Sequence, residues 1–197
     1  MSTETAKPRF TVDPKKVTKF DRTDAELQTF LIFAMFAAGK DADFASRAMS
    51  SLTGDCPMDL TPFEHLRQLG ETALHNKLVA ARIGQYSRLG RGLNELANSG
   101  LDLRTCSPED LEGIHGIGPK TSRFFILHSR PGAKCAVIDR QILKFLRDRQ
   151  VPNVPDGAPG SMKEYKRLER EFYSLAQRVF PGLPLAEADL ILWMHYS

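Results

Sequence analysis

The fold is decided by residues 111–145, which read LEGIHGIGPKTSRFFILHSRPGAKCAVIDRQILKF. Just before them, Ser107 can cap a short helix that begins at Pro108, and two acids follow where the helix dipole favours negative charge. The glycines of LEGIHGIG supply the backbone freedom of a tight turn, and Pro119 then opens a second helix. The pattern predicts a helix-hairpin-helix over about residues 108–130.

The turn and the start of the second helix form a candidate anion site. Backbone N–H groups at a helix N-terminus have no intrahelical partner, and the helix dipole adds positive potential there. A DNA phosphate is the natural occupant. We expect contacts from Gly116, Gly118, Lys120 and Thr121, and plain packing of two helices is the alternative.

Positive charge is concentrated after this turn. From Pro119 to Arg149 the sequence has eight Lys and Arg residues against two Asp residues, a net charge of +6 in a chain of +3. Such a local excess is typical of phosphate-backbone binding, which is independent of sequence and weakened by salt. Arg123 and Arg140 are the flanking cations that we expect on DNA, with a solvated helix face as the alternative.

Two motifs in order carry a family resemblance. IHGIGPKTSRFFI, followed by AVIDRQILKFL, resembles the helix-hairpin-helix Gly/Pro-Asp (HhH-GPD) DNA glycosylase superfamily that includes endonuclease III. In the lysine-using members a Lys follows the hairpin glycines, and an Asp lies in a V-D-x-x-I-type segment one short loop later. The matching residues here are Lys120 and Asp139.

The resemblance implies a covalent mechanism for these two residues. The amine of Lys120 would attack C1′ of a flipped-out deoxyribonucleotide, expel the base and leave a Schiff base that permits strand cleavage. Asp139 would stabilise positive charge on the sugar and help to deprotonate the amine. A lysine at a helix N-terminus near other cations has its neutral form favoured, as a nucleophile requires. A lysine that only contacts phosphate is the alternative.

The cysteines mark a departure from endonuclease III, whose kind ends in a four-cysteine cluster loop. Cys56, Cys106 and Cys135 show no pair spacing, so we expect neither a disulfide framework nor a zinc or iron-sulfur site. We therefore expect no metal and no cofactor.

A second departure lies after the central helix, where endonuclease III relatives usually have a polar residue that fills the gap left by the flipped base. Here the stretch reads Ala38-Gly39-Lys40-Asp41. Lys40 is instead a candidate contact to a phosphate or to an acidic substituent on the base, and a plain surface lysine at a helix end is the alternative.

The rest of the chain predicts further helices and no persistent strand. Residues 23–36 open with a capping box and are apolar nearly all round, which indicates a central helix. Further helices are expected after Asp41, after Thr61, over 74–96, after Ser161 and over 186–196, with a Pro- and Gly-rich loop at 151–160. In the helix after Ser161, we expect Glu164, Glu169 and Glu171 to form a mixed solvated face with the Lys and Arg residues between them. We predict an all-α fold of two helical lobes with the active cleft between them.

The N-terminal segment, residues 1–22, is polar. Residues 1–22 contain six basic residues and three acids, and we predict a basic flexible arm, with a first strap across the core as the alternative. Residues 23–197 would then form the helical domain. No apolar run reaches the roughly 20 residues that span a bilayer, so we expect no membrane contact. We expect the protein in the cytoplasm, either at a bacterial nucleoid or in a phage-infected host cell.

Three functions follow in order of preference. The first is a monomeric DNA glycosylase/AP lyase that excises a modified base from double-stranded DNA. The second rests on resemblance to phage enzymes of the same fold, which transfer the amine of a free amino acid onto pyrophosphorylated 5-hydroxymethyluracil in DNA. The third is a non-catalytic helix-hairpin-helix DNA-binding module.

Overall fold

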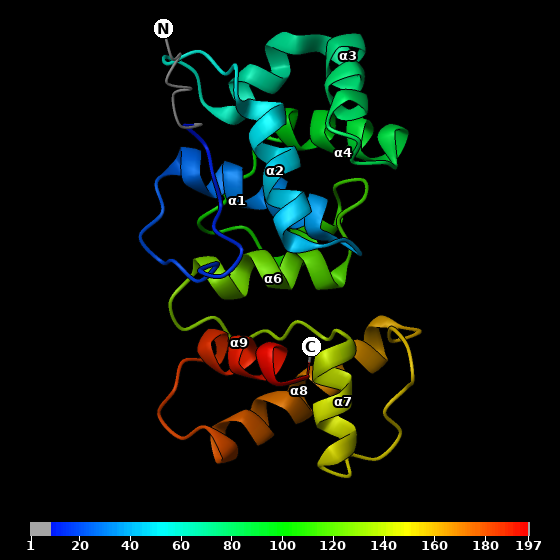
Figure 1. The fold of residues 1–197 in the computed structure, drawn as a ribbon. Coiled ribbons are helices and arrows are strands. Elements are labelled where there is room, and N and C mark those ends of the chain that lie inside the picture. Colours follow the sequence, from blue (N-terminus) through cyan, green and yellow to red (C-terminus); the bar gives the residue numbers. More distant parts are fainter. Residues whose placement is uncertain (1–8, 197) are drawn as a thin grey trace, which may run out of the picture. The chain divides into compact units, whose positions relative to one another are not determined.

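The computed structural model describes residues 9–196, and every regular element in this range is a helix (Figure 1). The all-α prediction is therefore confirmed. The chain divides into two compact units, one of residues 1–17 and 22–117 and one of residues 18–21 and 118–197. The first is called here the N-terminal unit and the second the C-terminal unit.

The N-terminal unit is built around its first helix. Its elements are α1 (Asp24–Ala37), α2 (Ala42–Thr53), α3 (Pro62–Ala80), α4 (Tyr86–Asn98) and α5 (Pro108–Glu112). Phe30, Leu31, Ile32 and Phe33 of α1 are at most 1% exposed, so the helix is buried all round as predicted. The capping box at Thr23 starts it, with the Thr23 side chain accepting from the N–H of Glu26.

The predicted helix over 74–96 is wrong, because two helices meet there at a turn. α3 ends at Ala80, and Arg82 and Gln85 adopt left-handed φ values of 53° and 50° before α4 begins. Ile83 in this turn is nevertheless fully buried. Since the turn keeps an apolar side chain in the core at helical spacing, the sequence pattern continues through the break.

The predicted arm of residues 1–22 falls in part on residues 1–8, which lie outside the described residues. In the described part, Phe10, Val12 and Val17 are buried. The guanidinium of Arg22 donates to the carbonyl of Val17 at 2.6 Å. Residues 9–17 thus contribute apolar side chains to the core of the N-terminal unit.

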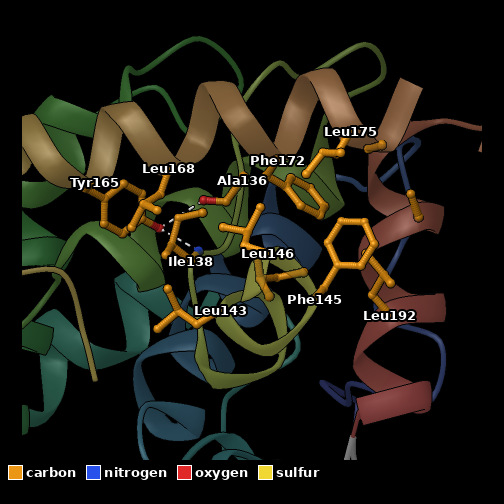
Figure 2. Close-up of a cluster of buried hydrophobic side chains, with 13 residues drawn as sticks. Ala136, Ile138, Leu143, Phe145, Leu146, Tyr165, Leu168, Phe172, Leu175 and Leu192 are labelled. Atoms are coloured by element: carbon orange, nitrogen blue, oxygen red, sulfur yellow. Dashed lines mark hydrogen bonds between the residues drawn. The ribbon is translucent and has the colours of Figure 1, made fainter. Parts of the chain in front are cut away.

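The C-terminal unit consists of α6 (Pro119–Ser129), α7 (Arg140–Asp148), α8 (Met162–Val179) and α9 (Leu185–Tyr196). Its core joins α7, α8 and α9 with the segment that precedes α7, as Figure 2 shows. Phe145 and Phe172 meet edge to face there, with ring centroids 6.1 Å apart. The predicted loop at 151–160 is confirmed, and Ser161 caps α8 by accepting from the N–H of Glu164. Among the described helices none is long and apolar enough to cross a membrane.

Candidate active site

The hairpin turn rests on one face of α4. Arg88 donates to the carbonyl of Gly116 at 2.9 Å, and the carboxylate of Glu95 accepts from the N–H of His115 at 2.7 Å. Between them, Gly92 lets the backbone of His115 approach so closely that a β-carbon would clash. Gly116 has a φ of 84°, a left-handed conformation that favours glycine. The spacing of Arg88, Gly92 and Glu95 places all three on one helix face.

The N-terminus of α6 is open. Gly118 is its N-cap and provides no side-chain hydrogen bond, and Pro119 occupies the first turn. Lys120 follows, with 53% of its side chain exposed. The side chain of Thr121 is buried, so any contact that it makes to an anion must come from its backbone N–H.

Asp139 caps α7 and faces Lys120. One of its oxygens, Oδ1, accepts from the N–H groups of Gln141 and Ile142, both at 3.0 Å. The other, Oδ2, lies 3.9 Å from Nζ of Lys120. Only 9% of the Asp139 side chain is exposed. Burial raises the pKa of this carboxyl above its ordinary value, although the two N–H groups and the lysine act to lower it. The group is therefore a better proton acceptor than a surface aspartate.

The two residues line one cavity of about 350 Å³. Its walls come from the start of α6, the start of α7, the 151–160 loop and α8. The lining residues are Pro119, Lys120, Ile138, Asp139, Arg140, Leu143, Asp156, Gly157, Ala158, Pro159 and Tyr165. All of them belong to the C-terminal unit, so the cavity is complete within that unit.

Arg123 does not lie on the surface, and its prediction as a DNA contact is corrected. Only 2% of the residue is exposed. Its Nε donates to the carboxylate of Glu169 at 3.1 Å, and its Nη1 donates to the carbonyl of Pro119 at 3.3 Å. It also lies over the ring of Tyr165, 4.8 Å from the centroid. A guanidinium enclosed in this way stabilises the unit and cannot reach a phosphate.

Glu169 corrects a second expectation, since the charges of α8 read as a mixed solvated face. Its Oε1 accepts from Arg123 and also from the N–H of Ala136 at 2.9 Å. Sequence reasoning missed both Glu169 and the polar use of Tyr165. Their separation by four residues, which puts them on one helix face, was the available signal.

A second cluster of buried polar side chains lies at the C-terminal end of α6. Nε2 of His128 lies 3.3 Å from Oδ2 of Asp189, and Nδ1 lies 2.8 Å from the hydroxyl of Thr18. His128 is fully buried and Asp189 nearly so. Lys19 donates its backbone N–H to the carbonyl of His128 at 3.1 Å. Asp189 is thus a buried partner of His128 inside the C-terminal unit.

The remaining predicted cations differ in their surroundings. Arg140 is exposed at the first position of α7 and lines the cavity. Lys40 belongs to the N-terminal unit, where its Nζ would lie 3.6 Å from a β-carbon on Gly84.

The cysteines form no disulfide. Cys56, Cys106 and Cys135 are buried as free thiols, and burial raises the pKa of Cys135 to about 12. Within residues 9–196, no three His, Cys, Asp or Glu side chains gather in a metal-binding cluster.

Comparison with known proteins identifies the fold. No protein-family model and no curated protein matches the sequence. Two solved structures match, both of an 8-oxoguanine DNA glycosylase from Methanocaldococcus jannaschii. The glycosylase/lyase in complex with a 15-mer DNA containing 8-oxoguanine shares 22% identity, with a TM-score of 0.65, over 89% of this chain and 82% of that one. The other structure of the enzyme shares 19% identity, with a TM-score of 0.68, over 92% and 83%. The chain therefore has the helical fold of these DNA glycosylases.

Proposed function

We propose that this protein is a DNA glycosylase with lyase activity, which excises a modified base through a Schiff base on Lys120. One observation carries the proposal: the amine of Lys120 lies 3.9 Å from the buried carboxylate of Asp139 in a shared cavity. The fold, which is that of an 8-oxoguanine glycosylase/lyase, adds independent support.

The chemistry divides between the two side chains. Lys120 must lose a proton before it attacks, and the raised pKa of Asp139 makes this carboxylate a suitable acceptor. The amine nitrogen then forms a bond to C1′ while the glycosidic bond breaks and the base leaves with the bonding electrons. Asp139 passes the accepted proton to the departing base, and its restored carboxylate charge stabilises the positive charge on the sugar and the attached amine. Opening of the sugar ring gives the protonated Schiff base, from which elimination cleaves the strand.

The surface around the pair fits a flipped-out nucleotide. The open N-terminus of α6 presents backbone N–H groups to a phosphate, and Arg140 adds an exposed positive charge. A base must leave the stack before C1′ can be attacked, and the adjoining cavity offers space for it.

Borohydride trapping tests the proposal directly. Purified protein is incubated with duplexes that contain single modified bases, beginning with 8-oxoguanine, and borohydride reduces any Schiff base to a stable adduct. We expect an adduct with the wild type and with Lys134→Ala, a control that removes another exposed lysine of the same unit. Lys120→Ala should give none. An adduct that survives Lys120→Ala would contradict the assignment.

The products separate this function from the two alternatives. Release of a free base supports excision. A heavier nucleoside with an intact glycosidic bond, formed only when a free amino acid is added, supports transfer onto a pyrophosphorylated base. DNA binding without any product, unchanged in Lys120→Ala, supports a non-catalytic module.

A further inference from the structure

The segment that precedes Asp139 contains buried backbone groups that need hydrogen-bond partners. Residues 135–138 are buried and lie outside any helix, so their backbone N–H and C=O groups have no regular partner. Buried backbone groups that remain unpaired are costly, and they are nearly always satisfied in folded proteins. For Ala136 and Ile138 the partners come from α8, as Figure 2 shows for Tyr165.

Tyr165 satisfies two of these groups with one hydroxyl. It donates to the carbonyl of Ala136 at 2.9 Å and accepts from the N–H of Ile138 at 3.0 Å. Glu169, one turn further along α8, accepts from the N–H of Ala136 at 2.9 Å. Three backbone groups of Ala136 and Ile138 are thereby fixed to one helix, shortly before Asp139.

The same helix also holds the start of α6. The hydroxyl of Tyr165 lies 3.4 Å from the carbonyl of Pro119, the residue before Lys120. That carbonyl also accepts from Arg123, which is bound in turn to Glu169. Tyr165 therefore touches the neighbours of both members of the proposed reacting pair, Ile138 beside Asp139 and Pro119 beside Lys120.

We propose that Tyr165, assisted by Glu169, is a positioning residue that sets the separation between the Lys120 amine and the Asp139 carboxylate. This inference rests on the proposed function, because it assigns the pair a shared task. Misplacement of reacting groups by about 1 Å can cost about 100-fold in rate, so a bond one residue away from each group is sufficient to matter. Burial raises the pKa of the Tyr165 phenol, which therefore stays protonated over the working pH range.

The first measurement is kinetic. Tyr165→Phe keeps the ring and removes the hydroxyl, and we expect the single-turnover rate of borohydride-trapped adduct to fall about 10- to 100-fold. DNA affinity should change less than about threefold, since the hydroxyl is not on the surface. Tyr173→Phe is the matched control, because Tyr173 lies on the same helix and its hydroxyl accepts from the side-chain amide of Gln177 instead of a backbone group near the site. It should keep the wild-type rate.

The second measurement needs no substrate. Carbon-13 NMR titration gives the pKa of Asp139, and Lys120→Met should raise it, because the ammonium of Lys120 lowers that pKa. If Tyr165 holds the pair together, this rise should be at least halved in the Tyr165→Phe background. A residue that only supports folding would lower the unfolding midpoint and leave the rise unchanged.

The outcomes divide cleanly. In Tyr165→Phe, slower adduct formation together with a smaller rise in the pKa of Asp139 on Lys120→Met supports the inference. An unchanged rise overturns it, whatever happens to stability. If the wild type forms no adduct but the rise is still halved, the proposed function fails and the positioning role stands. Should Tyr165→Phe not fold, Glu169→Gln takes its place in both measurements, and wild-type values in both would overturn the inference.

Discussion

Lys120 and Arg123 stand one turn apart on α6 and belong to the same basic segment, yet the fold treats them oppositely. The lysine is 53% exposed and stands 3.9 Å from its carboxylate. The arginine is 2% exposed, bonded to Glu169 at 3.1 Å, and enclosed by backbone and aromatic groups. A lysine held this loosely remains available to a substrate, whereas the arginine is committed to structure. A count of positive charges along the sequence therefore overestimates how many of them can contact DNA.

The largest effect expected from this contrast is catalytic. Lys120→Met should lower the single-turnover rate of adduct formation by at least about 1,000-fold, because it removes the nucleophile. Its free energy of unfolding should change by no more than about 0.5 kcal/mol, since the side chain is largely exposed. Urea unfolding and adduct kinetics on the same sample check both statements. A large stability loss would show that Lys120 is structural, like Arg123.

Arg123→Met should show the reverse pattern. Removing one partner of a buried ion pair leaves the other uncompensated, and we expect a loss of about 2–4 kcal/mol in the free energy of unfolding. Urea denaturation measures it. Arg123→Lys serves as the companion variant, because one ammonium cannot reproduce the fork of guanidinium contacts, and most of the loss should remain. Wild-type stability in both variants would contradict the structural role.

The salt dependence of DNA affinity distinguishes exposed basic side chains from buried ones. Arg140→Gln should reduce the slope of log affinity against log salt by about 1, because one phosphate contact is lost. Arg123→Met, once shown to be folded, should keep the wild-type slope. Fluorescence anisotropy with a labelled duplex over a range of salt concentrations measures both. Equal slopes for the wild type and Arg140→Gln would show that Arg140 does not contact a DNA phosphate.

The smallest effect concerns the pH dependence of stability. Burial raises the pKa of Asp139, so its contribution to stability is full below the ordinary value of 3.8 and is lost as the pH rises through the raised pKa. At pH 7 the buried carboxylate therefore costs stability. Asp139→Asn keeps an oxygen to cap α7, and should be more stable than the wild type at pH 7 by no more than about 1 kcal/mol.

Urea midpoints at pH 7 and pH 4 test this expectation, and the advantage of the asparagine should narrow at pH 4. The variant should also lose adduct formation, because an amide cannot accept the proton of Lys120. An asparagine variant that is less stable at both pH values would show that pairing with Lys120 outweighs burial.

Local sequence signals predicted most of the fold. Caps at Thr23, Asp41, Thr61, Ser107 and Ser161 each accept the backbone hydrogen bond that their position implied. Each of these hydrogen bonds joins a cap to the third residue after it, so the local sequence specifies it entirely. The break between α3 and α4 was missed because the buried Ile83 continues the helical spacing through a turn.

The site was predicted less completely, for a related reason. Motif spacing selected Lys120 and Asp139, which the structure brings together, and their roles stay predictions. Arg123 was assigned to DNA, and Glu169 to solvent, because each was judged with its sequence neighbours. Their pairing joins positions 46 residues apart, and no local periodicity encodes such a contact.

The four residues from Thr18 to Asp21 count with the C-terminal unit, although the chain on either side of them belongs to the other. On the ribosome they emerge long before α6 is synthesised, so Thr18 meets His128 only after most of the protein has been translated. A fragment of residues 118–197 would lack that hydroxyl, and a co-expressed peptide spanning residues 9–22 is the natural way to restore it.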